Sequence, residues 1–410
     1  MRLLISTYIL MALCVALLFP SCCDSHKNDV SPAGGDTCDC TVLVYMVGSN
    51  TLSGFVESNI SDMKKAVGKG ALHNGNLLLY IDRYGTPTLE RLSLENGTVK
   101  RTVKRTVERT YDDRNSVSSE VMASVIEEVK ALYPASTFGL VLWSHANGWY
   151  PAHIDTDLAL LRSTRSFGDD GGEAMNIDEI AAAIPDSTFD FILCDACYLG
   201  ASEVAYDLRA ECRYYVASPA AVMGAGFPYE EVITHLFSLE KPLVEKLTEV
   251  CRSYMDYYRS YRDPYGAVSL VDMSALDLLA QSVNRALRHQ TDSLAVDSVQ
   301  QYSQERGLSI SYQKLFFDLD DYVARACADS SAYAYFADCL DRTVLYADAT
   351  ERYLSSVLGV WRSYPLEKYC GLSAYIPGAV ADSDEVIDLY YRTLAWYKKV
   401  YAGIDEILIK

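Results

Sequence analysis

Two residues have the types and the spacing of a nucleophile and its general base. Cys197 follows the short apolar run 191–194, and His145 follows a similar run at 138–143. Runs of this length and composition are typical of buried parallel strands. If the two strands are neighbours, about 5 Å apart, both side chains face one crevice at the carboxyl edge of the sheet, where α/β proteins place reactive groups. This arrangement indicates nucleophilic catalysis by a cysteine with a histidine as base.

The elements that position these residues are predicted to form a parallel sheet covered by helices. Three further apolar runs, at 41–47, 77–81 and 214–218, have the composition of buried strands. Strands that are apolar throughout and alternate with helices are typical of the α/β class. The predicted helices are 52–67, 116–133 and 177–184, the last capped by Asn176, and Asn96-Gly97 predicts a hairpin within 88–106.

Beyond Glu230 the sequence predicts a mostly helical region, interrupted by two strands at 266–271 and 371–376. Its helices are rich in leucine and other apolar residues, which is typical of packing elements. We therefore expect an α/β catalytic domain at 38–272 and a helical C-terminal region at 273–410 that returns a strand near 371–376. The predicted helices include 274–288, 315–327 and 386–401.

The first residues have the pattern of a bacterial lipoprotein signal. Arg2 precedes an apolar run at 3–19, and Ser21 and Cys22 follow. A charged start, an apolar core and a small residue before a boundary describe a secretory signal, and a cysteine directly after the boundary resembles a lipobox. An uncleaved anchor helix is the alternative, but the run is slightly short of the ~20 residues of a bilayer span.

We therefore expect a signal peptide at 1–21, lipidation of Cys22 and a flexible tether at 22–37, where proline and paired glycines interrupt a polar segment. This places the protein in the bacterial cell envelope. The lipid would anchor it to a membrane, on the periplasmic side or at the cell surface.

Charge and motif content argue against several function classes. The formal net charge is −19, whereas a nucleic-acid-binding protein needs clustered lysine and arginine to contact phosphates. No GxGxxG or Walker pattern follows an early strand, so the sequence does not support a nucleotide-binding α/β protein. The 12 cysteines are irregularly spaced, which argues against a structural zinc site. Cys194 lies inside an apolar run and is assigned to the core.

The motifs together resemble those of the clostripain family of cysteine peptidases, which share the caspase-like fold with caspases and gingipains. Five landmarks fall in the family's order and span most of the chain after residue 38. A single histidine or a single Asp-Ala-Cys triplet would be weakly specific, whereas the ordered set is strongly so. The landmarks are Val44-Tyr45-Met46, Trp143-Ser144-His145 with Gly148-Trp149, Asp195-Ala196-Cys197 with Glu203-Val204-Ala205, Ala217-Ser218 with Gly226, Pro228 and Tyr229, and 371–377.

The resemblance implies roles for several of these residues. Cys197 is the expected nucleophile and His145 the expected general base and acid of acyl transfer. The backbone N–H groups of Cys197 and Ala146 are expected to bind the oxyanion. Asp195 matches the family's S1 acid and implies cleavage after basic residues, with arginine preferred over lysine because a guanidinium pairs with a carboxylate through two hydrogen bonds. Ser218 is the second expected substrate-binding residue.

Two departures from the family pattern bear on activity. Ala146 stands where members commonly have glycine, and alanine is disfavoured at positive φ. The loop 219–223, usually acidic in the family, is apolar here. We expect Asp195 to keep the selectivity for a basic P1 residue, in weaker form. A smaller or more apolar P1 residue is the alternative.

The long polar segment 150–172 matches the place where family members are cut to become active. Loops of this length are usually functional or disordered, and Arg162 and Arg165 are the candidate self-cleavage sites. We expect a monomer, as one chain or as a nicked two-chain form. No cofactor or metal is expected to be required. Some members use calcium, but the sequence has no EF-hand-like loop, and Asp169-Asp170 alone makes no site.

The sequence therefore predicts a secreted, lipid-anchored cysteine endopeptidase that acts on peptide or protein substrates with a basic P1 residue. The alternative from another class is a catalytically silent surface binding lipoprotein on the same fold. Ala146 and the apolar loop 219–223 are its support, and the intact pair of His145 and Cys197 opposes it.

Overall fold

The computed structural model describes residues 38–96, 101–151, 166–304, 314–357, 360–379 and 385–404. The predicted signal peptide and tether, with Cys22, lie outside these residues, as do the candidate cleavage sites Arg162 and Arg165. Residues Thr37–Lys410 form one compact unit. None of the helices within the described ranges is long and apolar enough to cross a membrane.

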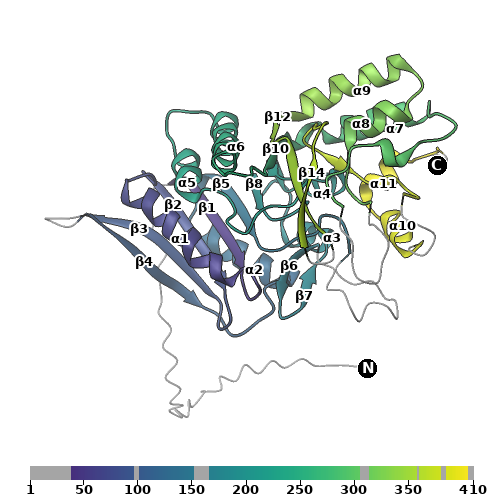
Figure 1. Ribbon diagram of the computed structural model, residues 1–410. Helices are drawn as coiled ribbons and strands as arrows, with labels where there is room; N and C mark the ends of the chain where they lie inside the picture. Colours follow the sequence, from purple (N-terminus) through teal and green to yellow (C-terminus); the bar gives the residue numbers. More distant parts are fainter. Residues whose placement is uncertain are drawn as a thin grey trace, which may run out of the picture. The chain divides into compact units, whose positions relative to one another are not determined.

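A nine-stranded sheet with the order β12-β10-β9-β8-β5-β1-β2-β3-β4 organises this unit (Figure 1). The strands from β9 to β2 run parallel to one another, and an antiparallel pair lies at each edge. The predicted α/β class with a mostly parallel sheet is therefore confirmed. The strands are β1 (Cys38–Val47), β2 (Gly75–Asp82), β3 (Thr88–Asn96), β4 (Arg101–Thr110), β5 (Ala135–Trp143), β8 (Phe189–Asp195), β9 (Cys212–Ala217), β10 (Ala267–Asp272) and β12 (Val344–Ala349).

Side chains of the central strands alternate between two apolar layers, one on each face of the sheet. In β1, Leu43, Tyr45 and Val47 belong to one layer, whereas Val44 and Met46 belong to the other. All five side chains are buried. A strand that is buried on both faces has no polar side to alternate with its apolar one, and so it is a continuous apolar run in the sequence.

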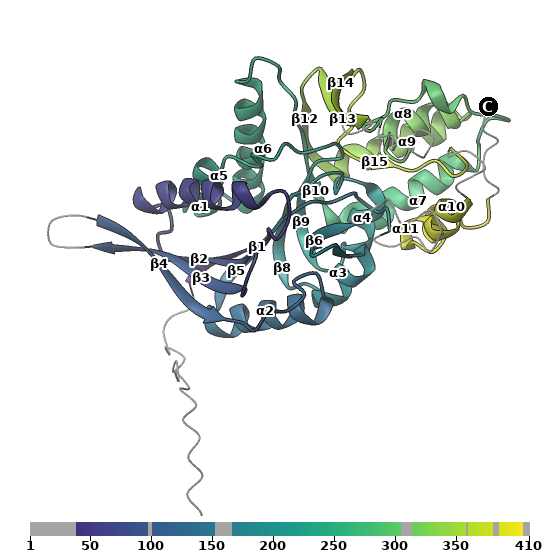
Figure 2. The ribbon, with the colours of Figure 1, turned by 60° about the horizontal axis from the view of Figure 1, so that its bottom comes forward.

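Helices cover both faces of the sheet (Figure 2). Helices α1, α5 and α6 pack on the layer that contains Val44, and α2, α3, α4 and α7 pack on the layer that contains Tyr45. Asn176 and Glu179 form a capping box at the start of α3, which confirms the predicted cap. The helices are α1 (Ser53–Gly68), α2 (Ser119–Leu132), α3 (Ile177–Ala183), α4 (Ser202–Asp207), α5 (Tyr229–Leu236), α6 (Leu243–Arg259) and α7 (Leu276–Leu287).

The region beyond Glu230 contains more strands than the two that the sequence predicted, and that prediction was wrong. β12 joins an edge of the central sheet, and β13 (Arg352–Val357) and β14 (Val360–Pro365) form a separate hairpin. β12 and β14 are half-exposed or exposed along their length. They therefore lack the apolar runs by which buried strands are recognised.

Two further elements of this region also differ from their prediction. The predicted strand 371–376 is reduced to β15 (Ser373–Ala374), which pairs with β11 (Phe317–Asp318) outside the central sheet. The predicted helix 386–401 is broken into two, because the N–H of Thr393 and of Leu394 each bond a carbonyl three residues back and close a tight turn. The remaining elements are β6 (Phe167–Asp170), β7 (Glu173–Met175), α8 (Leu319–Ala326), α9 (Ser330–Thr343), α10 (Glu385–Tyr391) and α11 (Ala395–Val400).

Candidate active site

The sheet brings His145 and Cys197 to neighbouring strand ends. In the parallel pairing of β5 with β8, Trp143 lies opposite Asp195, so His145 and Cys197 each lie two residues beyond a paired position. Both line a cleft of about 530 Å³, together with Ala146 and Asp195. The other lining residues are Thr51, Leu52, Phe55, Trp143, Ser144, Asn147, Ala196, Tyr198, Val222, Met223, Gly224 and Trp361.

The thiol of Cys197 lies against the loop that follows β9. The N–H of Val222 donates to Sγ at 3.3 Å, and Sγ donates to the Val222 carbonyl at 3.5 Å. The next residue, Tyr198, has a φ of 60°, a conformation that costs a bulky residue about 1–3 kcal/mol. Its N–H bonds the Ala220 carbonyl at 3.1 Å, and its ring stacks on Phe316 at 4.6 Å. These contacts hold a sharp turn directly after the candidate nucleophile.

The His145 ring is hydrogen-bonded to a residue that the sequence analysis missed. The Oγ1 atom of Thr51, in the loop after β1, lies 2.7 Å from Nε2 of His145. The neighbouring Asn50 orders this loop, because its Nδ2 group donates to the carbonyls of Val47 and Asp169, each at 3.0 Å. The signal for Thr51 was present in the sequence: it follows the carboxyl end of the strand next to β5.

Strand β6 supports the backbone on either side of Ala146. The N–H of Gly168 donates to the His145 carbonyl at 2.9 Å, and the N–H of Asn147 donates to the Ser166 carbonyl at 3.2 Å. Ala146 and Phe167 face each other between these two bonds. In such a pair the residue's own N–H points away from the partner strand. The N–H of Ala146 is therefore directed away from β6.

Ala146 takes no conformation that requires glycine. Among the described non-glycine residues, those with positive φ are His73, Tyr84, Ser187 and Tyr198. The backbone of Ala146 is thus free of the strain that positive φ would impose on a side chain. This weakens the case for a catalytically silent protein, which rested in part on the substitution of glycine by alanine.

Asp195 lies at the base of the cleft and is held by two donors. Its side chain is 5% exposed, and Oδ2 accepts hydrogen bonds from the Tyr229 hydroxyl at 2.8 Å and the Phe227 N–H at 3.2 Å. Gly226 has a φ of 68°, and a Cβ at this position would lie 2.3 Å from Oδ2, so only glycine fits. Burial raises the pKa of Asp195 to about 6. The group is therefore mostly ionised at neutral pH.

Ser218, the other expected substrate-binding residue, is buried outside the lining of the cleft. Its hydroxyl accepts from the Ala220 N–H and donates to the Ala220 carbonyl, both at 3.1 Å. The carbonyl of Ser218 accepts from the Gly200 N–H at 2.8 Å. These bonds shape the loop that contacts Cys197. A direct contact of Ser218 with substrate stays a prediction.

The C-terminal region contacts the loops of the cleft through a buried carboxyl group. Oε1 of Glu203 accepts from the Tyr375 N–H at 2.8 Å and from the Tyr391 hydroxyl at 3.1 Å. The rings of both tyrosines pack on Trp149, at 5.0 and 5.1 Å. Burial raises the pKa of Glu203 to about 7. The residues after His145 and after Cys197 are thus joined to the last strand and helices of the chain.

Within the described ranges, no three His, Cys, Asp or Glu side chains are grouped as a metal site requires. The expectations for cofactors and calcium stay predictions. The cleft also contains Phe55, Met223 and Trp361, which sequence analysis missed. Trp361 comes from the hairpin β13–β14, whose polar composition gave no signal of its proximity to Cys197.

The sequence matches the model of the clostripain family, Peptidase_C11, over residues 44–401. An inactive zymogen C11 protease from Parabacteroides distasonis has 32% sequence identity and a TM-score of 0.76, and the alignment covers 90% of this chain and 99% of that one. A comparison with curated protein sequences gave no match.

Two further solved structures come from Bacteroides thetaiotaomicron. A secreted C11 cysteine protease in complex with an irreversible peptide inhibitor has 27% identity and a TM-score of 0.74, over 88% of this chain and 99% of that one. The secreted C11 cysteine protease iotapain has 24% identity and a TM-score of 0.75, over 89% of this chain and 100% of that one. The latter likeness is one of fold.

Proposed function

The chain belongs to the clostripain family and is a cysteine endopeptidase, and on this premise we propose that it cleaves after basic residues with His145 and Cys197 as its catalytic dyad. The observation that carries the proposal is the single cleft shared by His145, Cys197 and the buried carboxylate of Asp195. The nucleophile, the base and a group that recognises a cation are thus within reach of one extended peptide.

The reaction begins when His145 takes the thiol proton and the Cys197 sulfur attacks the scissile carbonyl carbon. The oxyanion accepts hydrogen bonds from the N–H groups of Cys197 and Ala146, the second of which points away from β6. His145 then gives its proton to the leaving amine, and the C–N bond breaks to leave a thioester. Water, deprotonated by His145, attacks the thioester, and the sulfur leaves and regains the proton.

Asp195 gives the enzyme its preference for a basic P1 residue. A guanidinium offers two parallel N–H donors to a carboxylate, whereas an ammonium is a point charge, so arginine is preferred over lysine. Val222 lies along the same cleft and suits the aliphatic stem of either side chain. The apolar loop 219–223 supplies no second carboxylate.

Fluorogenic peptides with Arg, Lys, Asp, Asn or Ala at P1 test this proposal, with protein that begins at Thr37 and reducing conditions. Arg and then Lys peptides are expected to be cleaved, and both Cys197→Ala and His145→Ala are expected to remove turnover. If only peptides without a basic P1 residue are cleaved, the catalytic roles of His145 and Cys197 stand, but the proposed role of Asp195 is wrong. Absence of turnover in the wild type, after nicking and addition of calcium, would overturn the dyad.

We also propose that the enzyme is activated by self-cleavage after Arg162 or Arg165. The similar protein from Parabacteroides distasonis is described as an inactive zymogen, which supports a step of activation. Because β5 and β8 lie on either side of the cut and pair with each other, the two chains are expected to stay together as one monomer. Peptide sequencing of the new N-terminus tests the site. Nicking of Cys197→Ala at the same position without added protease would exclude self-cleavage.

The enzyme is further proposed to be a lipoprotein of the bacterial envelope, anchored through Cys22. The similar C11 cysteine protease with 27% identity is described as secreted, which supports export. Expression of the full chain in a bacterium, with labelled palmitate and a Cys22→Ala control, tests the anchor. Label that persists in the variant would overturn it.

A further inference from the structure

One of the four tryptophans of the chain differs from the others in its environment. Trp143, Trp149 and Trp396 are at most 2% exposed, whereas Trp361 is 57% exposed. Trp361 also lines the cleft that contains Cys197. Exposed indole surface gains roughly 25 cal/mol per Å² when it is covered, and tryptophan is enriched among residues that dominate binding energy. Its position indicates that it contacts a ligand in the cleft.

Two other exposed apolar side chains lie in the same cleft. Phe55 on α1 is 38% exposed, and Met223 in the loop after β9 is 40% exposed. A Cβ added to Gly224 would lie 2.8 Å from the Phe55 ring, so this ring lies directly against the backbone of the loop. We call Phe55, Met223 and Trp361 the apolar rim. Its members come from three elements that are far apart in the sequence.

The hairpin that carries Trp361 is fixed at its base. Tyr353 is buried in β13, and its ring stacks on that of Tyr364 in β14 at 5.7 Å. The N–H of Gln304 donates to the Ser355 hydroxyl at 2.8 Å. Trp361 is therefore presented to the cleft by an ordered element, which lowers the entropic cost of binding a ligand against it.

We propose that the apolar rim is a substrate subsite that binds a large apolar side chain at P2, the residue before the basic P1 residue. This inference rests on the proposed function. Neighbouring side chains of an extended peptide point to opposite sides. Asp195 lies at the base of the cleft with 5% exposure, whereas the rim residues are 38–57% exposed. A P1 side chain directed at Asp195 therefore directs the P2 side chain towards the rim.

The chemistry of the rim selects against negative charge at P2. Its members are an aromatic ring, an indole and a thioether, and none of them compensates an anion that loses its water. Large apolar side chains such as leucine and phenylalanine fit this surface, and sulfur and rings pack well on aromatic faces. The cleft thus combines one buried anionic contact for P1 with one apolar contact for P2.

The test measures kcat/KM of the full chain for peptides with Arg at P1 and Gly, Asp, Leu or Phe at P2. The ratio of Leu or Phe to Gly is expected to be about tenfold or more, as is usual for a hydrophobic subsite. Trp361→Ala is expected to reduce this ratio to about twofold, through a lower kcat/KM for the Leu and Phe peptides. Trp361→Phe should keep most of the ratio.

Val360→Ala is the matched control, because Val360 is the neighbouring residue on β14, is 56% exposed and lies outside the lining of the cleft. It is expected to leave the P2 ratio unchanged. Phe55→Ala provides a second variant of the rim on a different element. A wild-type ratio near one, or a preference for apolar residues that is confined to P1′, would overturn the inference.

Loss of turnover for the Gly and Phe peptides alike in Trp361→Ala would also overturn it, since this would show a general structural role. If the proposed function itself is wrong, the wild-type protein will cleave no Arg peptide, whatever the P2 residue. Tryptophan fluorescence gives a second measurement without turnover. A peptide with Phe-Arg should change the emission of Cys197→Ala more than that of Cys197→Ala with Trp361→Phe, in which Trp143 is the remaining tryptophan of the cleft. An equal change in both would contradict the subsite.

Discussion

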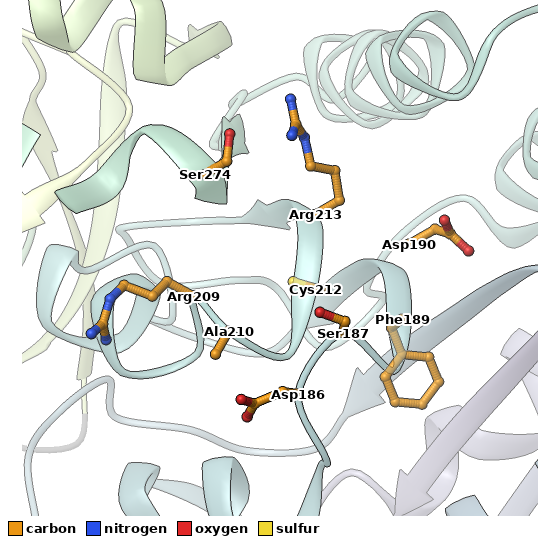
Figure 3. A pocket seen from close by; sticks show the side chains of 9 residues that line it. All are labelled: Asp186, Ser187, Phe189, Asp190, Arg209, Ala210, Cys212, Arg213 and Ser274. Carbon is orange, nitrogen blue, oxygen red and sulfur yellow. The ribbon is translucent and has the colours of Figure 1, made fainter. Parts of the chain in front are cut away.

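Strands β8 and β9 have a hollow at each end, and each hollow contains a cysteine and an aspartate. The cleft at the carboxyl ends, of about 530 Å³, contains Cys197 and Asp195. A hollow of about 400 Å³ at the amino ends is lined by Cys212 and Asp186, among others (Figure 3). Both regions thus contain a cysteine and an aspartate, and they differ in how these residues are held.

The two arginines of the amino-end hollow are each close to a carboxylate. Arg213 pairs with Asp272 at 2.9 Å, and Arg209 lies 3.4 Å from Asp277. Cys212 is 5% exposed, and burial raises the pKa of its thiol well above the ordinary value. Because the thiolate is the reactive form, Cys212 is inert at neutral pH.

The residues of the carboxyl-end cleft are held instead by backbone and neutral groups. The Cys197 sulfur contacts the backbone of Val222, and the Asp195 carboxyl accepts from a hydroxyl and an N–H. These contacts fix both side chains in place. Because the groups that hold the Asp195 carboxylate are uncharged, they do not neutralise it. The comparison shows that a reactive site needs polar groups that are oriented without being neutralised, which loops at the carboxyl ends of parallel strands provide.

The largest expected contrast between the two hollows is the effect of removing each cysteine. Cys197→Ala should lower kcat/KM for Arg peptides by about 10⁴-fold or more, because the nucleophile is lost. Cys212→Ala should leave kcat/KM within about twofold, as it removes only a buried hydrophobe. Peptide mass spectrometry after iodoacetamide treatment of the folded protein should find Cys197 alkylated before Cys212. Equal labelling of both would remove the contrast.

The two aspartates provide the next contrast. Asp195→Asn should lower kcat/KM for Arg peptides by about 10²–10³-fold, since a buried charge pair is lost. Asp186→Asn, the matched change in the amino-end hollow, should have no effect. The measurement is kcat/KM of both variants for peptides that differ only in the P1 residue. Retention of arginine preference in Asp195→Asn would assign the S1 contact to another residue.

The pH dependence of selectivity sharpens the role of Asp195. Burial raises its pKa to about 6, so the carboxyl is ionised above this pH and neutral below it. The ratio of kcat/KM for Arg to that for Gln at P1 should fall by about tenfold between pH 7 and pH 5. Titration of His145 affects both substrates and cancels in the ratio. Asp195→Asn should show a flat ratio, and a similar fall in this variant would contradict the assignment.

The smallest expected effect concerns the orientation of the base. Thr51→Val removes the hydrogen bond to His145 Nε2 and should lower kcat by about 3- to 10-fold with KM unchanged, in line with one hydrogen bond. Thr51→Ser should retain the activity and the pH profile of kcat/KM. Ser274→Ala removes a hydroxyl from the amino-end hollow and serves as the control. A rise in KM alone for Thr51→Val would indicate a substrate contact instead.

Much of the fold follows from local pattern. The strands β1, β5 and β8 are buried on both faces, so each is a continuous apolar run that the sequence reveals. The start of α3 could also be predicted, because Asn176 is the N-cap of that helix and belongs to its capping box. His145 and Cys197 were found because each follows such a run, and parallel strands bring their carboxyl ends to one edge. Here local pattern determined the class of the sheet and two residues of its cleft, and the family resemblance added Ala146 and Asp195.

Other features were decided by the tertiary structure alone. The strands β12 and β14 are half-exposed or exposed along their length and therefore lack an apolar run, because neither is buried on both faces. Only the structure shows why residue 226 has to be glycine, because a side chain there would collide with Asp195. Only the structure shows that Thr51 is hydrogen-bonded to His145. Trp361 reaches the cleft from the far end of the chain. The spacing of apolar residues shows how far a single helix or strand is buried. The contacts of Gly226, Thr51 and Trp361 join elements that are far apart in the sequence, and no local pattern indicates them.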